Sequence, residues 1–491
     1  MPEFRNKAIE FLIVGILLAF SSVLILSNLG NVYLWQDEAQ TALISETVLA
    51  HGIPLGHDTR NSFSQDYGKD YGKNGIWLWH PWLPFYVLAG FFAVFGVSTF
   101  MARLPFALFG IGTILLAYYF ARDLWGSRRA GVLASVLLML SAWFLILVRQ
   151  CRYYSPDAFF VLLGLYAYVS LLQRKKYAGP AFGISAILLF HTHYVHYGIL
   201  LAVVIIHSAV WHRNRLKTVF VVSALTAIIN LPWIIWFSSM GRVIQAAGLD
   251  PLRISQFLTL YLTDAIRYVF PPAILLLLPL VWARHKRWIV ADTDVRSGMW
   301  LLVLFLVIHL LATTLTATQV YFRFLMPMIP VACLIMAVIM HSAMTVRGGV
   351  IAVILVALTF CWPMGGYLYE ITHHYNGPNE GIARYLNAHA RKDDVVAVLG
   401  EEMPLKFYTR LRIVGGTTGE KISLADADWV VIREAGASME FVKSQRKSSA
   451  YQAITLQCPE TRVENRECPK FHRFRTPTNV RPVTIFRRIS R

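Results

Sequence analysis

Charged side chains are scarce in this chain of 491 residues, in which Asp, Glu, Lys and Arg together make up 15% of the sequence. Hydrophobic residues make up 56% of it. A chain of this size with so little charge is not an ordinary soluble enzyme, because it cannot cover its surface with polar groups. We therefore expect the lipid bilayer to be its solvent and its fold class to be that of a polytopic α-helical membrane protein.

Acidic residues are the scarcer charge type: 28 Asp and Glu stand against 46 Lys and Arg, a formal net charge of +18. In a membrane protein this excess reflects first the cytoplasmic loops and only then an anionic ligand. No basic stretch carries interleaved aromatic residues on a polar surface, so we expect no nucleic-acid partner. No small-residue cleavage site follows the first apolar run, residues 8–29, which should therefore stay as a span.

Apolar runs of spanning or near-spanning length divide the chain, and clusters of Lys and Arg separate them. The runs cover residues 8–29, 104–121, 130–148, 156–172, 178–211, 218–237, 269–283, 298–316, 324–342 and 348–366. The clusters are Arg122/Arg128/Arg129, Arg174/Lys175/Lys176, Arg213/Arg215/Lys217, Arg284/Lys286/Arg287 and Arg347. If all clusters are cytoplasmic, as the positive-inside rule predicts, an even number of crossings must separate them.

Parity then predicts two features of the topology. Residues 178–211 must form two short helices that turn at residues 191–197, on the outer side. Residues 80–98 must not cross, and their shortness and aromatic content are typical of an interfacial or re-entrant helix. The prediction is about eleven spans, with the N-terminus inside, a first outer loop at residues 30–103 and everything after Tyr367 outside.

The last part of the chain has the pattern of a small outer α/β domain. A helical pattern covers residues 379–391, and short β-rich runs cover Val395–Leu399, Trp429–Ile432, Ala453–Leu456 and Val483–Phe486. Cysteine is rare, with five in the chain, and only Cys458 and Cys468 share a polar region. If this region is outside the cell, a disulfide between these two is expected.

Polar residues that can do chemistry gather in the turns predicted at the outer face, and ionisable residues inside the spans are few. A transporter would place its ionisable groups near the midplane, often on broken helices with an internal repeat, and the sequence shows neither feature. A site at one face suits an enzyme that acts on a lipid headgroup. A transporter or flippase of a lipid-linked sugar is the alternative.

Five motifs in the first 200 residues resemble those of the GT-C membrane glycosyltransferases, in the order of that family. They are Trp-Gln-Asp37-Glu38-Ala, Trp-His80-Pro81-Trp, Phe-Gly96 to Ala-Arg103-Leu-Pro105, Ala-Arg122-Asp-Leu-Trp-Gly126 and Arg149-Gln-Cys-Arg152-Tyr-Tyr-Ser-Pro-Asp157. The chain is most similar to the protein O-mannosyltransferases, the lipid A aminoarabinose transferases and the rhizobial galacturonosyltransferases. The resemblance implies an acidic pair and a juxtamembrane helix in the first outer loop, and an outer C-terminal domain. It also implies a polyprenyl-phosphate sugar as donor, with undecaprenyl phosphate as the carrier in bacteria.

Two positions depart from the family pattern. Relatives often have His-Pro-Pro or Lys-Pro-Pro where this chain has His80-Pro81-Trp82. Asp157 follows Arg152 in the spacing of the mannosyl and aminoarabinose branches, whereas the galacturonosyl branch often lacks this aspartate. The departures leave the subfamily open.

Transfer of a sugar from a phosphodiester needs a base for the acceptor proton and hydrogen-bond donors for the leaving phosphate. We predict that Asp37 is this base or binds the acceptor, with Glu38 beside it, and that Asp157 is the second catalytic acidic residue. A structural alternative stands beside each: Asp37 would cap the helix that runs through Ala42, and Asp157 would cap the span that starts at Ala158.

Arginines at the outer face suit the phosphate of the donor. Arg149 and Arg152 offer bidentate donors, and anchoring to lipid headgroups is their alternative role. The resemblance implies a donor contact for His80 and a phosphate role for Tyr321 and Arg323. By itself, an arginine at a span end is more often a snorkelling anchor.

The histidines of the predicted outer turn are His191, His193 and His196. We expect hydrogen bonds from this turn, by His191 and His193, to the donor phosphate or sugar, and a metal site is the alternative. No cofactor should be required. A divalent cation held by Asp37 and Asp157 remains the other possibility.

The sequence thus predicts a GT-C transmembrane catalytic domain at residues 1–366 and an extracytoplasmic α/β domain at residues 367–491. The predicted activity is inverting transfer of a sugar from undecaprenyl phosphate to an envelope acceptor, which is lipid A, lipopolysaccharide or protein. The predicted location is the bacterial inner membrane, with membrane lipids around the spans and the active site at the outer face.

Overall fold

The computed structural model describes residues 2–240, 250–285, 293–420, 427–433, 450–461 and 468–489. The chain divides into two compact units, which are described separately below. One consists of residues 1–27, 106–368 and 467–469, and the other of residues 28–105, 369–466 and 470–491. The predicted basic positions Lys286 and Arg287 lie outside the described residues.

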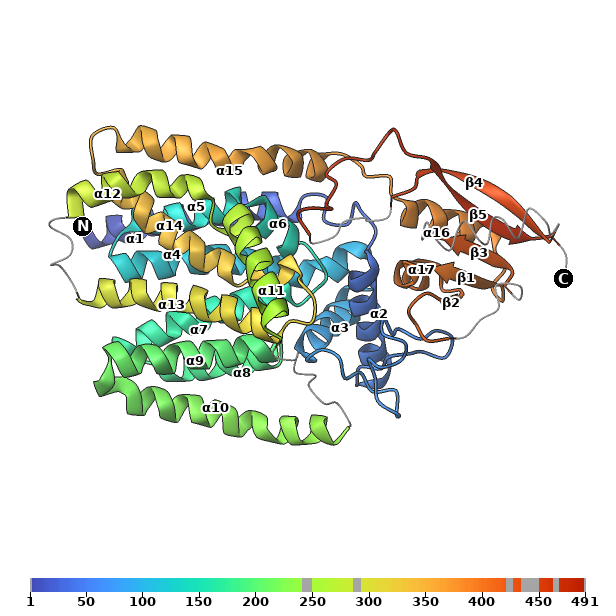
Figure 1. The fold of residues 1–491 in the computed structure, drawn as a ribbon, viewed down its shortest axis with the longest axis horizontal. Coiled ribbons are helices and arrows are strands. Elements are labelled where there is room, and N and C mark those ends of the chain that lie inside the picture. Colours follow the sequence, from blue (N-terminus) through green and yellow to red (C-terminus); the bar gives the residue numbers. More distant parts are fainter. Residues whose placement is uncertain are drawn as a thin grey trace. The chain divides into compact units, whose positions relative to one another are not determined.

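Apolar helices make up most of the fold (Figure 1). They are α1 (Pro2–Leu26), α4 (Thr99–Trp125), α5 (Arg128–Leu140), α6 (Ala142–Val148), α7 (Tyr154–Leu172), α8 (Ala178–Phe190), α9 (Tyr194–Trp211), α10 (Arg213–Ser239), α11 (Pro251–Asp264), α12 (Leu278–His285), α13 (Thr293–Thr316), α14 (Met328–Ala343) and α15 (Gly349–Thr372). Three short helical segments lie between these helices: the π-helix η1 (Ala265–Val269) and the 3-10 helices η2 (Pro272–Leu277) and η3 (Phe322–Leu325). In the core, α7 packs against α8 and α9, and α9 packs against α10 and α13.

Six helices in the described part of the chain are long and apolar enough to cross a membrane, and the number rises to nine if each of three bent pairs is one span. The pair α5 and α6 bends by 74° at Ser141, whose side chain accepts a hydrogen bond from Phe144 N at 3.4 Å and so starts a new helix. Two further apolar helices, α8 and α14, have 13 and 16 residues, short of the usual spanning length. The protein is a multi-pass helical membrane protein, and the count of about eleven spans stays a prediction.

The predicted turn within residues 178–211 is confirmed. α8 ends at Phe190 and α9 begins at Tyr194, so three residues separate two helices. Residues 80–98 contain the single short helix α3 (Leu83–Phe95), which packs against α2 (Gln36–His51). Its 13 residues agree with a helix that does not cross, and its depth in the membrane stays a prediction.

The C-terminal part of the chain forms a five-stranded mixed sheet in the order β2-β1-β3-β5-β4. Its elements are α16 (Pro378–His389), β1 (Val395–Leu399), α17 (Glu402–Thr409), β2 (Arg412–Gly415), β3 (Trp429–Ile432), β4 (Tyr451–Pro459) and β5 (Pro482–Arg488). β1 pairs in parallel with β2 and β3, and β5 pairs antiparallel with β3 and β4. Alternate residues of β1 point to opposite faces, so that Val396 and Val398 join the core under α16 while Ala397 joins the core of the other face.

The predicted disulfide is wrong for this structure, in which both Cys458 and Cys468 are thiols. Cys458 is buried in β4. Its sulfur lies so close to Gly381 of α16 that an added Cβ there would meet it at 2.4 Å. The thiol therefore fills the core between sheet and helix as a small apolar group, which is a common role for buried cysteine.

Candidate functional site

Asp157 lies in the first turns of α7 and is almost completely buried, with 1% of its surface exposed. It is not the predicted cap, because α7 begins at Tyr154 and the Asp157 N–H already donates to the Tyr153 carbonyl at 3.0 Å. Its Oδ2 accepts a hydrogen bond from Nδ1 of His196 at 2.6 Å. Oδ1 is buried and has no hydrogen-bond partner among the described residues. A buried carboxylate with an unused oxygen makes Asp157 a candidate functional residue.

Three histidines extend the cluster from Asp157. His193 precedes α9 as its N-cap and accepts a hydrogen bond from His196 N at 3.4 Å, which places the two rings face to face with centroids 3.8 Å apart. The ring of His309, from α13, lies 4.7 Å from that of His196. His309 Nε2 donates to the Phe324 carbonyl at 2.8 Å, so its buried Nδ1 carries a lone pair.

Neither the predicted histidine group nor any other group of at least three His, Cys, Asp or Glu side chains is arranged to hold a metal within the described residues. The stacked rings of His193 and His196 show why, because stacking aligns ring faces and keeps the nitrogen lone pairs from converging. His191 stands apart from them: its half-buried ring packs edge-on against Trp233 of α10 at 5.2 Å.

The two predicted phosphate arginines lie in the turn between α6 and α7 but differ in what they contact. Arg149 Nη1 donates to the carbonyls of Ile25 at 2.6 Å and Ser27 at 2.9 Å, and so satisfies the last turn of α1. Arg152 is buried, and its guanidinium lies over the rings of Tyr153 and Tyr154 at 5.4 and 5.9 Å. Arg149 is therefore largely used by the fold, whereas Arg152 belongs to the cluster.

Tyr321 and Arg323 belong to the same cluster, because both contact Phe324, which lies near His193. The Arg323 guanidinium lies 4.0 Å from the centroid of the Tyr321 ring and 5.7 Å from that of Phe324. The Phe324 ring in turn lies 6.4 Å from that of His193. The structure thus brings together a cluster from four separate segments: Arg152, Tyr153, Asp157, His193, His196, His309, Tyr321, Arg323 and Phe324.

Asp37 and Glu38 belong to the other unit, at the start of α2. The N-cap of this helix is Trp35, whose N–H donates to Glu38 Oε2 at 3.3 Å. Asp37 is therefore the second residue of the helix, and the predicted alternative that it is the cap is wrong. A carboxylate in the first turn is stabilised by the helix dipole, and Asp37 is partly exposed.

Glu38 has a structural partner that the sequence did not predict. Arg103 Nε donates to Oε1 at 2.8 Å and Arg103 Nη2 donates to Oε2 at 2.6 Å, a side-on bidentate pair. Glu38 is fully buried, and Arg103 also donates to the carbonyls of Leu29, Val32 and Tyr33. Because Arg103 binds both of its oxygens, Glu38 fixes the start of α2.

The C-terminal α/β elements hold α2 in place within this unit. Gln36 Oε1 accepts from Met403 N at 3.0 Å, and the rings of Tyr33 and Tyr408 stack at 3.8 Å. His80 lies in the loop before α3, partly exposed, with its ring stacked on Trp77 at 6.3 Å. The acidic pair is therefore rigidly placed on a helix, as a catalytic carboxylate requires.

Comparison with known proteins places this geometry in a family context. Residues 79–236 match the family described as dolichyl-phosphate-mannose-protein mannosyltransferase. A protein of Aquifex aeolicus described as uncharacterized is 31% identical over 128 residues, which are 23% of this chain, and the chain spans about a quarter of that relative (25%). Two solved structures of ArnT from Cupriavidus metallidurans share the fold over 98% of both chains, each with a TM-score of 0.60. One is bound to undecaprenyl phosphate and is 12% identical in sequence, and the other is in the apo state and is 13% identical.

These matches confirm the resemblance to the GT-C membrane glycosyltransferases that the motifs predicted. The segment matched by the family includes His80, Arg149, Arg152, Asp157 and the three histidines at 191, 193 and 196. The buried carboxylate–imidazole pair therefore lies inside the stretch of chain that carries the family's sequence.

Proposed function

We propose that this GT-C protein is a membrane glycosyltransferase that moves a sugar from a polyprenyl-phosphate carrier to an acceptor of the cell envelope. The observation that carries the proposal is the shared fold over 98% of both chains with a structure that holds undecaprenyl phosphate. A fold alone does not define an activity, but here the family match covers the segment with the buried Asp157–His196 pair. The acceptor is lipid A, lipopolysaccharide or protein.

The helical unit supplies the groups that suit a donor phosphate. Arg152 and Arg323 carry permanent positive charge, and each guanidinium lies over tyrosine rings that hold its plane. Charge builds on the phosphate oxygens as the bond to the sugar breaks, so fixed cations there lower the barrier. His193 and the Tyr321 hydroxyl, from the same cluster, are the proposed neutral partners of the phosphate or the sugar.

Asp157 and His196 act as a positioning pair in this proposal. A carboxylate accepts hydrogen bonds, so His196 carries its proton on Nδ1 and leaves Nε2 as the acceptor. The hydrogen bond to Asp157 fixes this tautomer and the ring orientation, in the way that carboxyl groups orient histidines in many enzymes.

Asp37 is the proposed base that takes the proton of the acceptor hydroxyl. Its place in the first turn of a rigid helix suits a single displacement, in which the acceptor oxygen attacks the sugar carbon opposite the leaving phosphate and inverts it. Such a reaction needs no strong acid, since the polyprenyl phosphate leaves as a stable anion. We also propose that the reaction proceeds without a metal ion.

We further propose that the site and the C-terminal sheet lie outside the bacterial inner membrane, with the basic clusters inside. A single cysteine at Ser98 should then react with an impermeant reagent added from outside. Labelling at Ser98 only after permeabilisation would contradict this orientation.

The decisive experiment incubates purified protein in nanodiscs with a radiolabelled polyprenyl-phosphate sugar and candidate acceptors. Release of free polyprenyl phosphate together with a labelled acceptor supports the transferase. Movement of the labelled lipid between leaflets without its cleavage would mean a transporter instead.

The catalytic role of Asp37 is tested by Asp37→Asn, which keeps the shape of the side chain and removes its basicity. Turnover should fall by about a hundred- to ten-thousand-fold, the usual worth of a general base, while the protein still binds donor. The matched control is Glu46→Gln on the same helix, which removes a carboxylate paired with Arg410 and should keep turnover. Near-normal turnover in Asp37→Asn would remove this residue from the mechanism and favour Asp157.

A further inference from the structure

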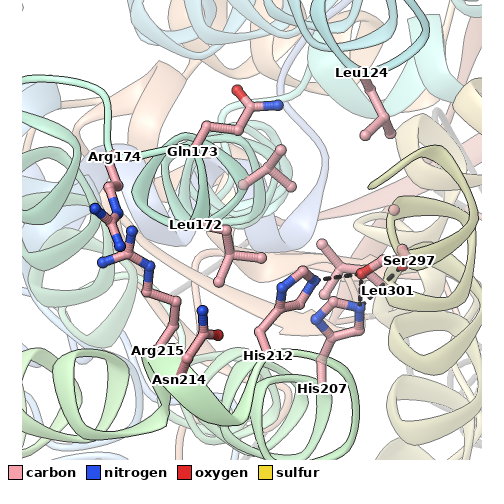
Figure 2. A pocket seen from close by; sticks show the side chains of 12 residues that line it. Leu124, Leu172, Gln173, Arg174, His207, His212, Asn214, Arg215, Ser297 and Leu301 are labelled. Carbon is pink, nitrogen blue, oxygen red and sulfur yellow. Dashed lines mark hydrogen bonds between the residues drawn. The ribbon is translucent and has the colours of Figure 1, made fainter. Parts of the chain in front are cut away.

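A second polar site lies at the other end of α7 from Asp157. It is a pocket of about 320 Å³, formed where α4, α7 and α9 end and where α10 and α13 begin (Figure 2). Gln173, which lines it, is 16 residues further along the chain than Asp157, which corresponds to about 24 Å along a helix. The volume is at the lower end of the range for pockets that bind small molecules. The pocket is thus separate from the cluster around Asp157.

The charge of this pocket has one sign. Arg174 and Arg215 both line it, and Figure 2 shows their guanidinium groups on the same side of the view. No acidic side chain is among the described residues that line it, and the amides of Gln173 and Asn214 add further hydrogen-bond donors. Two arginines in one pocket repel each other, so an anion bound between them would be stabilised by both.

The opposite wall is a fixed chain of hydrogen bonds. His207 Nε2 donates to the Ser297 carbonyl at 2.9 Å, and its Nδ1 therefore accepts from the Tyr168 hydroxyl at 2.9 Å. Ser297 Oγ lies 2.6 Å from Nε2 of His212, which also lines the pocket (Figure 2). Apolar residues, among them Leu124 and Leu301, complete the lining. A lining of polar and apolar groups fits a ligand with a charged head and an apolar body.

Two tryptophans place the pocket at the level of lipid headgroups. Trp211 and Trp300 are both exposed, and their rings stack at 6.1 Å. Trp211 also stacks on His207 of the pocket wall at 5.2 Å. Exposed tryptophans of membrane proteins prefer the interface between water and hydrocarbon, where the ring is apolar and the indole N–H is wet.

We propose that this pocket binds a phosphate group, either that of an anionic lipid headgroup or that of a soluble phosphate. Arg174 and Arg215 hold the phosphate oxygens, and His212 donates from the opposite wall. Basic pockets between transmembrane helices on the cytoplasmic side are a known way to bind anionic headgroups, and the basic clusters of this end lie on that side in the proposed topology. The proposal does not depend on the transferase activity.

The test uses the full chain in nanodiscs of neutral phosphatidylcholine, with phosphatidylglycerol or cardiolipin added in steps and bound lipid counted by native mass spectrometry. The variant is Arg174→Gln with Arg215→Gln. The control is Arg213→Gln, a basic residue of the same helix end that does not line the pocket and whose Nε donates to the Ala209 carbonyl. A parallel measurement follows saturable binding of inorganic phosphate to protein in uncharged detergent. Monodisperse elution and an unchanged midpoint of thermal unfolding establish that each variant is folded.

Loss of two charge-assisted contacts should weaken binding by at least about tenfold in the double variant, and the control should bind as the wild type does. Retention of the anionic lipid by the wild type in excess inorganic phosphate identifies the headgroup as the source. Saturable binding of inorganic phosphate that removes the lipid identifies a soluble phosphate. Equal lipid and phosphate binding by the double variant and the control, or no saturable binding of either to the wild type, overturns the proposal.

Discussion

The buried pair Glu38–Arg103 offers the sharpest test of how the segment of residues 30–103 is built. Glu38 is fully buried and Arg103 is 5% exposed, so neither charge is solvated if the other is removed. Breaking a buried ion pair by removing one partner costs about 3–5 kcal/mol, because an uncompensated charge stays in a medium of low polarity. Arg103→Met should cost this full amount, since it also leaves the carbonyls of Leu29 and Val32 without their donor.

Replacing both partners should cost less than replacing one. In Glu38→Met with Arg103→Met no buried charge remains, and such apolar replacements are often close to neutral. The double variant should therefore be more stable than Arg103→Met alone. The stability of Glu38→Gln should lie between those of the double variant and Arg103→Met. Its amide still accepts one hydrogen bond, while the buried guanidinium loses its counter-charge.

Hydrogen exchange of the α2 amides, followed by mass spectrometry, measures this cost locally. A loss of about 3–5 kcal/mol corresponds to exchange faster by roughly two to three and a half powers of ten. The matched control is Arg410→Gln, which breaks an equally bidentate pair with Glu46 whose arginine side chain is 55% exposed. Such an exposed pair is worth less than about 1 kcal/mol. Unchanged exchange in Glu38→Gln together with a loss of turnover of a hundredfold or more would make Glu38 a catalytic residue and refute its structural role.

Three further outcomes are expected. Asp157→Asn and His196→Phe should each lower turnover and flatten its pH profile. The double variant should lose little more turnover than either single variant, because the two residues act as one pair. Additive losses of turnover would show that they act separately. Burial lowers the pKa of the Lys406 ammonium to about 8, so the unfolded chain binds more protons than the folded one between about pH 8 and 10.5, and the free energy of unfolding rises with pH in that window. Thermal unfolding of Lys406→Met should no longer show this rise. A rise that persists in the variant would assign it to another group. Chelation by EDTA should leave turnover unchanged, and activity restored only by added Mn²⁺ would establish a cation.

Strong local patterns let the sequence predict much of the C-terminal sheet. β1 and β3 have the predicted bounds because each is a short run of buried β-branched residues, which has few alternatives. α17 and β2 were missed. α17 contains Pro404 and Lys406, and the buried face that stabilises it meets a loop more than 300 residues earlier, which no local window contains.

In the candidate site too, residues that belong to a local motif could be predicted, whereas partners from distant parts of the chain could not. The motifs identified Asp37, Arg152 and Asp157, but the partner of Asp157 depends on how α7 and α9 pack, and His309 stands alone in its span. Both cap alternatives were wrong because the helices begin one and three residues before the aspartates, a boundary error typical of sequence patterns.

The contact between the segment just before α2 and α17 joins residues made at very different times. Leu34 N donates to the Tyr408 hydroxyl at 2.9 Å across a separation of 374 residues. At about 5–20 residues per second, the ribosome needs roughly 20–75 s to travel from one to the other. During that time most of the membrane helices must insert while α2 waits without its final support. The start of α2 therefore gains this contact only when the C-terminal sheet has been made.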